Sequence, residues 1–465
     1  MIFTPVGELA ALVRAREISP VELTEHFLER LERLGPRYNA VVTVMREHAL
    51  IQARRAEGEI AAGRYRGPLH GIPYGAKDLL ATAGAPTTWG AAPYKAQHFG
   101  FDATVVAKLQ DAGAVLVAKL AMIELAGGMG YRQPTASFTG PCINPWNGNA
   151  WSGGSSSGSG AAVSAGLVPF AIGSETWGSI LSPAGYCGLA GLRPTYGRVS
   201  RHGAMAICWS LDKLGPLAQT ADDCGLVLDA IAGADPKDPT ASERPYRYEA
   251  LDRTGFRFGI LPGVTDGCEE AMVENFARSL GVLKKIGTVE DVTLPDLPYE
   301  QITRTILQVE AVSAFEDLIE SGGIAGLTAP EDRYTPYARE AILAKDYLKA
   351  VRLRAVMARE IDRVLQNFDA LVAPGRINEA PVLGQEFRSA LRSTEKDVMG
   401  AKDVMGAIGN GAGLPAVCVP NGSGVRGLPT SIQFMGRAWE ENTVLAAARA
   451  YQSLTDWHTR HPKVD

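Results

Sequence analysis

The sequence predicts an α/β protein in which a sheet is covered by helices on both faces. Segments with helical periodicity alternate along the chain with short apolar segments typical of buried strands. Hydrophobic residues make up 46% of the 465 residues and charged residues 21%, which provides enough apolar side chain for a large core. Because no linker-like stretch divides the chain, we expect a single domain over residues 1–465, with a helical subregion at about residues 265–365.

The individual elements follow from this pattern in chain order. Thr4 and Pro5 supply the N-cap and first-turn proline typical of a helix start, and the stretch from Ser19 repeats the arrangement. Gly113 separates a helical segment from the strand-like sequence AVLVAK. Helices are expected at residues 6–16, 19–34, 46–62 and 102–112, after Glu269 and from Glu440. Residues 161–173 predict a buried helix followed by a strand, and further strands are expected at residues 256–263, 369–374, 416–422 and 430–436.

Composition and charge exclude several classes of protein. The net charge is -5, which argues against stable binding of nucleic acid through its phosphates. The six cysteines contain no C-x-x-C pair and fit reduced thiols in a cytosolic setting. The N-terminus lacks the apolar region of a signal peptide, and the longest uncharged run of apolar character, residues 160–173, is too short to span a bilayer. We therefore expect a cytoplasmic protein with no membrane association.

Residues 130–215 are rich in Gly, Ser and Pro and contain the stretch WSGGSSSGSGAAVSAG. This stretch lacks the lysine of a phosphate-binding P-loop, and none of the seven histidines has the spacing of zinc ligands, so no metal is expected. If a serine of this stretch is a nucleophile, it needs a base other than histidine to accept its proton. Lys77, within IPYGAKDLL, is a candidate because burial lowers the pKa of a lysine. The structural alternative is that Lys77 pairs with Asp78 or with another carboxylate.

Three groups of motifs carry a family resemblance. GIPYGAKDLL, the segment from GGSSSGSG to RVSRHG, and SLDKLGPLAQTADD together resemble the amidase signature enzymes. GNGAGLPAVCVPNG and GLPTSIQFMG resemble the C-terminal part of the same family, so the match covers nearly the whole chain. The resemblance implies a mixed, twisted sheet sandwiched between helices. It also implies hydrolysis of a carboxylic amide without a metal or an organic cofactor.

The resemblance assigns roles to three side chains as a Ser–cis-Ser–Lys triad. Lys77 corresponds to the base, Ser155 to the bridging serine and Ser179 to the nucleophile that forms an acyl-enzyme. The 24 positions between the two serines match the family spacing. Gly153 and Gly154 remove Cβ atoms next to the expected cis peptide. The backbone N–H groups implied for the oxyanion hole are those of Thr176, Trp177, Gly178 and Ser179.

The loop around Ser179 departs from the family pattern. The family commonly has T-D-T-G-G-S where this chain has SETWGS, so Glu175 replaces Asp and Trp177 replaces Gly. Our hypothesis is that the indole of Trp177 narrows the acyl pocket; the alternative is that the ring packs into the core. Some family members carry an arginine just after the nucleophile, whereas residues 180–182 are Ile, Leu and Ser. Half-amides of dicarboxylic acids are therefore less expected as substrates.

KAVRLRAVM and KDVMGAIGNGAGLP resemble the A subunit of the tRNA-dependent amidotransferase. The resemblance matches Arg354 and Asp403 to groups that hold the carboxylate and the ammonium of glutamine. The duplicated KDVMGAKDVMGA makes Asp397 a rival of Asp403. The alternative is an ordinary helix arginine and a loop aspartate. Met129 is a further candidate for the acyl pocket, with core packing as its alternative.

Three functions follow from this sequence. A stand-alone amidase acting on a small-molecule amide is favoured. A glutaminase subunit of an aminoacyl-tRNA amidotransferase would need a partner for tRNA and a passage for ammonia. A catalytically inert binding module on the same fold is the alternative from another class, but retention of all three triad positions argues against it. A homodimer is compatible with the family resemblance.

Overall fold

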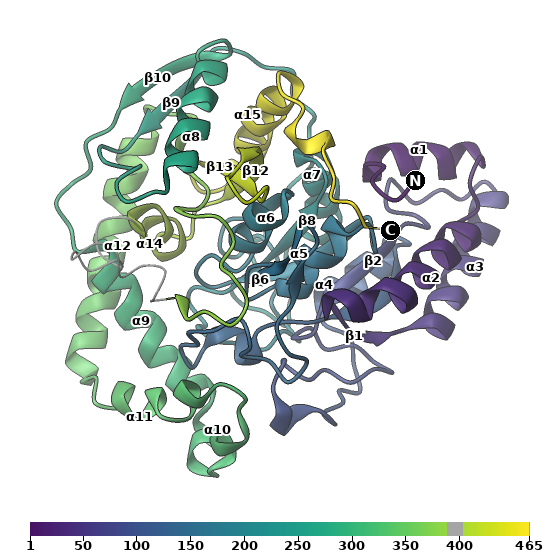
Figure 1. The fold of residues 1–465 in the computed structure, drawn as a ribbon, viewed down its shortest axis with the longest axis horizontal. Coiled ribbons are helices and arrows are strands. Elements are labelled where there is room, and N and C mark those ends of the chain that lie inside the picture. Colours follow the sequence, from purple (N-terminus) through teal and green to yellow (C-terminus); the bar gives the residue numbers. More distant parts are fainter. Residues whose placement is uncertain (388–402, 465) are drawn as a thin grey trace.

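The computed structural model describes residues 1–387 and 403–464, and its centre is a large mixed sheet (Figure 1). Within the described residues this sheet has eleven strands in the order β1-β3-β2-β6-β8-β7-β12-β13-β11-β9-β10. The strands are β1 (Val41–Val44), β2 (Pro73–Lys77), β3 (Val115–Leu120), β6 (Phe170–Glu175), β7 (Ala190–Arg193), β8 (Lys213–Ala218), β9 (Phe256–Ile260), β10 (Gly287–Asp291), β11 (Ala370–Pro374), β12 (Ala416–Ser423) and β13 (Pro429–Met435). A separate hairpin pairs β4 (Ile143–Asn144) with β5 (Asn147–Trp151).

The sheet mixes parallel and antiparallel neighbours. Strand β2 runs parallel to both β3 and β6, and β9 runs parallel to β10 and β11. The central strands β8, β7, β12 and β13 pair antiparallel with their neighbours. Every residue of β3, β6 and β8 is buried, so these strands are covered on both faces. The predicted fold class, a mixed sheet between helices, is confirmed.

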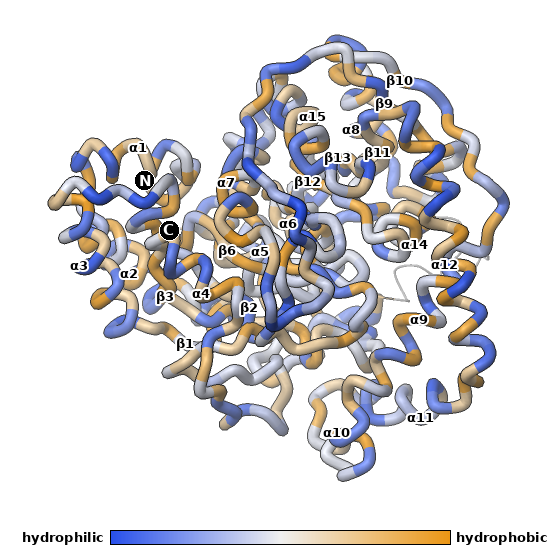
Figure 2. The backbone as a smooth tube through the Cα atoms, turned by 180° about the vertical axis from the view of Figure 1, so that it is seen from behind, coloured by the Kyte–Doolittle hydropathy of each residue, from blue (hydrophilic) through white to orange (hydrophobic). Residues whose placement is uncertain are grey.

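Helices cover both the sheet and its two ends. Helix α5 (Ser157–Ser164) packs against α6 (Leu181–Cys187), α7 (Ala221–Ile231) packs against α15 (Glu441–Ser453), and both pairs contact central strands. Helices α1–α3 lie at one end of the molecule and α9–α12 at the other (Figure 1). The outer helices, such as α3 and α12, alternate between hydrophilic and hydrophobic residues (Figure 2). The helices are α1 (Val6–Ala15), α2 (Pro20–Tyr38), α3 (Arg46–Ala61), α4 (Thr104–Asp111), α5 (Ser157–Ser164), α6 (Leu181–Cys187), α7 (Ala221–Ile231), α8 (Glu270–Leu283), α9 (Tyr299–Ala314), α10 (Glu316–Glu320), α11 (Thr335–Arg339), α12 (Ala344–Leu365), α14 (Val404–Gly411) and α15 (Glu441–Ser453).

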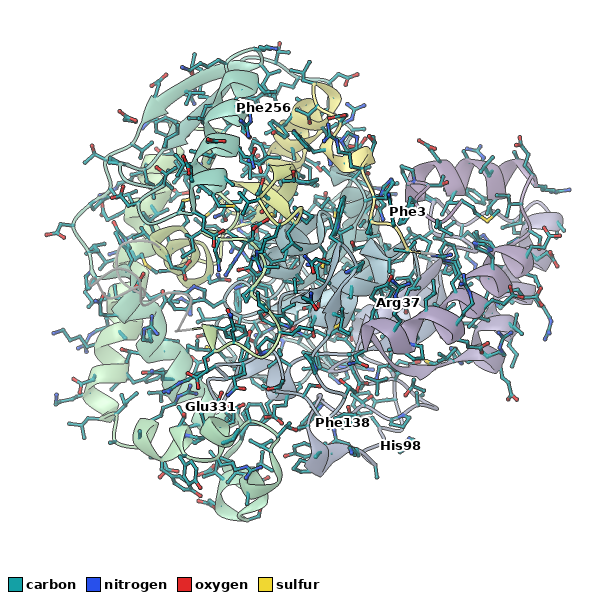
Figure 3. All side chains as sticks on the ribbon, in the orientation of Figure 1. Phe3, Arg37, His98, Phe138, Phe256 and Glu331 are labelled. Atoms are coloured by element: carbon teal, nitrogen blue, oxygen red, sulfur yellow. The ribbon has the colours of Figure 1, made fainter. Side chains whose placement is uncertain are left out.

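The two ends of the chain lie close together (Figure 1). Phe3, labelled in Figure 3, stacks on His461 with ring centroids 4.1 Å apart. The stacked rings attach the C-terminal segment to the N-terminal one. Among the helices of the described residues, none combines the length and the apolar character needed to cross a membrane.

Most of the expected elements are present with small shifts at their ends. Ser19 caps α2 by accepting hydrogen bonds from the N–H groups of Val21 and Glu22. At α1 the N-cap is Pro5 rather than Thr4, and no side chain caps the helix. Strands β1, β7, β8 and β10 were not anticipated from the sequence. The sequence of β8, KLGPLA, contains Gly and Pro, which disfavour a strand, and burial between β6 and β7 overrides that preference.

Candidate active site

Two parallel strands bring Lys77 to a cluster of serines. Lys77 is the last residue of β2, and the neighbouring strand β6 carries Ser174 near the same edge, because Ala76 pairs with Ile172. The Nζ atom of Lys77 lies 2.7 Å from Oγ of Ser155 and 2.9 Å from Oγ of Ser174. The lysine is fully buried. The amine is therefore held between two hydroxyl groups away from bulk water.

The surroundings of Lys77 favour its neutral form. Complete burial lowers the pKa of Lys77 well below its ordinary value, and the charges of Asp212 and Glu175 act in the opposite direction. Asp78 does not pair with Lys77: its carboxylate lies 3.0 Å from Nζ of Lys119. No ion pair of Lys77 is present in the described parts of the chain. An amine in this environment can accept a proton.

Ser155 follows a tightly packed turn that only glycine fits. The peptide bond between Gly154 and Ser155 is cis. Gly153 has a φ of 86°, and a Cβ atom there would lie 2.7 Å from the backbone of Pro183. A Cβ atom at Gly154 would lie 2.6 Å from the indole of Trp151. The glycine pair is therefore required by close contact as well as by conformation.

The buried carboxylate of Glu175 shapes the loop that carries Ser179. It accepts hydrogen bonds from the N–H groups of Ile180 and Leu181, and its other oxygen lies 2.9 Å from the guanidinium of Arg193. Burial alone would raise the pKa of Glu175, but Arg193 and the nearby donors lower it below its usual value. Glu175 is thus an ionised brace that joins the end of β6 to the start of α6.

The backbone of residues 176–179 leaves its N–H groups available. Within the described chain, none of these four groups donates a hydrogen bond. The side chain of Thr176 does have a partner, because its hydroxyl donates to Asp212 at 2.5 Å. Asp212 in turn accepts the N–H groups of Ile207 and Cys208. The loop is therefore held by side chains while its amides remain free for a ligand.

Ser179 is buried at this loop, with 8% of its surface exposed. Its carbonyl oxygen accepts the N–H group of Ser156, at 3.3 Å, which ties the loop to the start of α5. In the part of the chain that the structure describes, no hydrogen bond joins the hydroxyl groups of Ser155 and Ser179. The structure thus joins Lys77 to Ser155 directly, and it holds Ser179 on the adjoining loop.

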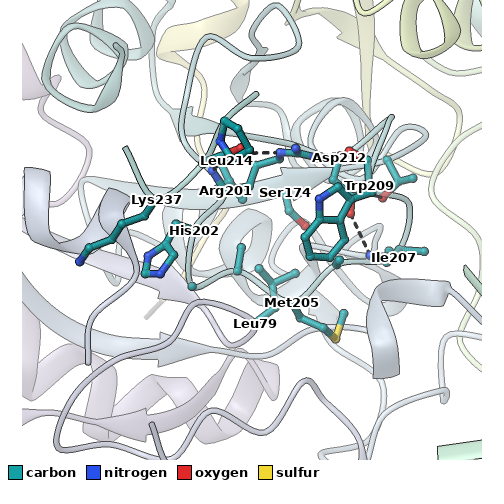
Figure 4. A pocket seen from close by; sticks show the side chains of 16 residues that line it. Leu79, Ser174, Arg201, His202, Met205, Ile207, Trp209, Asp212, Leu214 and Lys237 are labelled. Carbon is teal, nitrogen blue, oxygen red and sulfur yellow. Dashed lines mark hydrogen bonds and ion pairs between the residues drawn. The ribbon is translucent and has the colours of Figure 1, made fainter. Parts of the chain in front are cut away.

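Successive residues of this segment face two different cavities. Ser174 and Thr176 line a small cavity of about 170 Å³, together with Asp212. Figure 4 shows Ser174 and Asp212 toward one end of the small cavity, and His202 and Lys237 toward the other. Glu175 and Trp177 line a large cavity of about 300 Å³. The alternation follows from the extended backbone, in which consecutive side chains point to opposite sides.

The large cavity lies beside Ser179 and is partly shaped by Trp177. Gly154, Gly178 and Ser182 also line it. The indole Nε1 of Trp177 donates a hydrogen bond to the carboxylate of Asp403. Trp177 is not among the residues with positive φ, whereas Gly178 has a φ of 86°. The turn therefore places its left-handed position at the remaining glycine, so the substitution by Trp is accommodated without strain at position 177.

Three other candidate residues lie in different surroundings. The guanidinium of Arg354 donates to the carbonyl oxygens of Gly411 and Ser210, both at 2.7 Å. No hydrogen bond or ion pair joins Arg354 to Asp403 in the described chain. Met129 is fully buried in the main hydrophobic core and is not among the residues lining either cavity. Asp397 lies outside the described residues.

The sequence reasoning missed several residues of the site. Ser174 stands five positions before Ser179, and only the register of β2 against β6 brings it to Lys77. Arg376 follows β11 and also lines the large cavity. Lys213 is a second buried lysine next to Asp212, and burial lowers its pKa to about 7. No cluster of three His, Cys, Asp or Glu side chains able to hold a metal occurs among the residues described.

Comparisons with known proteins identify the class and the family. The similar proteins include amidases from several bacteria, and the chain is an amide-hydrolysing enzyme. The sequence model of the amidase family matches residues 22–445, and the chain belongs to that family.

Three relatives illustrate the match. The chain is 36% identical to the A subunit of glutamyl-tRNA(Gln) amidotransferase from Methylococcus capsulatus, over 98% of each protein. It is 38% identical to AmiD of Mycobacterium tuberculosis, a protein named as an amidase, over 98% of this chain and 95% of that protein. The crystal structure of the peptide amidase from Stenotrophomonas maltophilia superimposes with a TM-score of 0.86 and 30% identity, over 99% of each chain.

Proposed function

We propose that this enzyme hydrolyses a small carboxylic amide through an acyl-enzyme, with Ser179 as nucleophile, Ser155 as proton relay and Lys77 as base. The observation that carries the proposal is the 2.7 Å hydrogen bond between Nζ of Lys77 and Oγ of Ser155 in a fully buried setting. Burial of a lysine without an ion pair favours its neutral form, which is the form that a base requires.

In each half of the reaction, Lys77 accepts one proton through Ser155 and later returns one. Oγ of Ser179 attacks the amide carbon while its proton passes to Ser155, and Ser155 passes its own proton to Lys77. The protonated Lys77 returns a proton by the same route to the leaving nitrogen, which departs as ammonia or an amine. Water then attacks the ester on Ser179, and the same relay removes and returns a proton.

Two features of the loop support this mechanism. The negative oxygen of each tetrahedral intermediate would bind the free N–H groups of Thr176, Trp177, Gly178 and Ser179. Loss of one such donor typically lowers the rate by about 10²–10³. The relay needs a hydrogen bond between the Ser155 and Ser179 hydroxyls, and catalytic hydrogen bonds often tighten when substrate binds.

A second candidate is the glutaminase subunit of an amidotransferase. The 36% identity to one such protein over nearly the full length favours it. Against it, the guanidinium of Arg354, the group expected to hold the carboxylate of glutamine, donates to two backbone carbonyls. A stand-alone amidase needs neither that contact nor a partner protein, and it remains the function we propose.

Ammonia release from a panel of simple amides and from glutamine tests this proposal. We expect wild-type enzyme to hydrolyse several simple amides without a partner. We also expect hydroxylamine to divert part of the product to hydroxamate, because it intercepts an acyl-enzyme. Glutamine as the sole substrate, with activity rising on addition of a partner protein, would instead support the amidotransferase. Absence of hydrolysis with every amide and ester tested would support the inert binding module.

Trp177 provides a test of the acyl pocket. Replacing Trp177 by glycine removes the indole from the large cavity and its bond to Asp403. We expect the ratio of kcat/KM for a bulky amide to that for a small amide to rise about tenfold or more, the scale of one methylene group in a hydrophobic pocket. The comparison of benzamide with acetamide measures this ratio. An unchanged preference would show that the ring acts only as packing.

A further inference from the structure

We propose that Arg376 binds a carboxylate on the substrate, so that the preferred amides carry a free carboxylate group. This inference rests on the proposed function, because it places the substrate in the large cavity beside Ser179. It concerns a residue that neither the sequence motifs nor the triad uses. It also identifies the chemical class of the substrate.

The position of Arg376 is the first observation. The residue follows β11, at the edge of the sheet where the large cavity opens, and lines that cavity together with Trp177 and Gly178. Its Nη1 atom lies 3.7 Å from the point where a Cβ atom of Gly178 would stand. Gly178 immediately precedes Ser179. The guanidinium is therefore within a small molecule's length of the attacking hydroxyl.

The second observation is that Arg376 interacts with Tyr186 but has no carboxylate partner among the described residues. In residues 1–387 and 403–464, no ion pair of Arg376 is formed, and its Nε atom is buried without a hydrogen-bond partner. The guanidinium lies against the ring of Tyr186, 5.2 Å from the centroid. Arg376 is half-buried, and a buried guanidinium nitrogen such as its Nε normally has a carboxylate or carbonyl oxygen as partner. A carboxylate from a ligand would supply such a partner, because its two oxygens match the fork of the guanidinium.

The third observation concerns the other charges that line the large cavity. Glu175 and Arg193 neutralise each other at 2.9 Å. The carboxylate of Asp403 accepts the indole N–H of Trp177. Burial alone would lower the pKa of Arg376, but Tyr186 and Asp403 raise it above the usual value, so the group stays charged. Arg193 also has one buried nitrogen without a partner, but Glu175 matches its charge. Among the described residues of this lining, Arg376 is thus the cation without a carboxylate partner, and the carboxylate of a ligand would bind there.

This arrangement changes an expectation from the sequence. Residues 180–182 carry no arginine, which disfavoured half-amides of dicarboxylic acids. Arg376 provides a cation next to the same loop from a different strand. The carboxylate of such a substrate can therefore be held without an arginine in the loop itself.

Matched pairs of amides test the inference. Succinamate and butyramide differ in a carboxylate on the acyl side, and N-acetylglycine and N-ethylacetamide differ in one on the amine side. We expect wild-type enzyme to prefer the charged member of one pair. Arg376→Met should lower kcat/KM for that member by about 10–100-fold, chiefly through KM, as expected for loss of a charged hydrogen-bond pair. It should change the neutral member less than threefold, which also shows that the variant is folded.

Two control variants separate contact from general charge. Arg376→Lys should retain part of the preference for the charged substrate, because lysine keeps the positive charge but lacks the two parallel N–H donors of the guanidinium. Arg304, whose guanidinium lies 5.7 Å from the Trp177 ring, is a cation close to the site that does not line the large cavity. Arg304→Met should leave the ratio of charged to neutral substrate within threefold. A loss of preference in Arg304→Met equal to that in Arg376→Met would overturn the inference.

A binding measurement keeps the inference separate from the proposed function. Calorimetry on the Ser179→Ala variant should show succinamate or N-acetylglycine binding at least tenfold more tightly than butyramide or N-ethylacetamide, and Arg376→Met should abolish the difference. Equal binding of charged and neutral ligands refutes the role of Arg376, even if wild-type enzyme hydrolyses amides. Conversely, tighter binding of the carboxylate-bearing ligands by a protein that cleaves no amide would refute the proposed function, while the carboxylate site at Arg376 would be supported.

Discussion

Replacing Ser179 by alanine is expected to lower kcat for amide hydrolysis by about 10⁴–10⁶, with KM changed only a few-fold. The variant keeps the loop amides and the large cavity, so it still binds substrate, but it has no hydroxyl to form the ester. Steady-state ammonia release measures the loss. Mass spectrometry should show an acyl adduct on wild-type enzyme and none on the variant.

A neighbouring serine provides the matched control. Ser182 lines the large cavity, is buried to a similar degree and lies on the same loop-to-helix segment. Ser182→Ala should therefore retain kcat within tenfold, because no proton transfer passes through it. If Ser179→Ala retained more than a tenth of the wild-type rate, the nucleophile would have to be another group.

Replacing Lys77 by methionine is expected to lower kcat/KM by about 10³–10⁵. Removing one residue of a catalytic triad typically lowers the rate nearly as much as removing all of its residues. In wild-type enzyme, kcat/KM should rise with pH as Lys77 loses its proton and then reach a plateau. The sign follows from the role of the neutral amine, which the protonated form cannot fill. The lowered pKa of Lys77 brings this rise well below the range of an ordinary lysine. A pH–rate profile from pH 5 to 10 measures it.

Lys213 is the control for the assignment of that profile. Burial lowers its pKa to about 7, with Arg193 acting in the same direction, so it also titrates within the measured range. Lys213→Met should keep the rise of kcat/KM with pH, because Lys213 is not hydrogen-bonded to either serine of the proposed relay. Loss of the rise in Lys213→Met would assign the profile to Lys213 and remove the argument for Lys77.

Stability should depend on Lys77 in the same pH range. Between its lowered pKa in the folded protein and the ordinary pKa of the unfolded chain, the unfolded chain binds one proton more. The free energy of unfolding therefore rises with pH across that window. Lys77→Met should flatten this part of the curve, as measured by denaturant unfolding at several pH values.

Local sequence signals predicted much of the secondary structure and the chemistry. Ser19 and the apolar periodicity after it predicted α2, and Ser19 is its cap in the structure. AVLVAK predicted β3, because an uninterrupted apolar run fits a strand buried on both faces. The apolar sequence around Lys77 predicted a buried lysine with a low pKa, and this environment is observed. Strands β7, β8 and β10, which contain Gly or charged residues, and the four-residue β1 were missed, since their pairing comes from neighbours distant in sequence.

The chain itself determined the fold class, the family, the buried setting of Lys77 and the glycine pair before Ser155, because each depends on residues close together in sequence. Only the tertiary structure decided which distant groups meet. The register of β2 and β6 brings Ser174 to Lys77, and the end of β11 brings Arg376 to Gly178. In the tertiary structure the guanidinium of Arg354 donates hydrogen bonds to backbone carbonyl oxygens, and Met129 packs in the hydrophobic core. The physical reason is that strand pairing and packing set these distances, and neither is encoded in the local pattern of a segment.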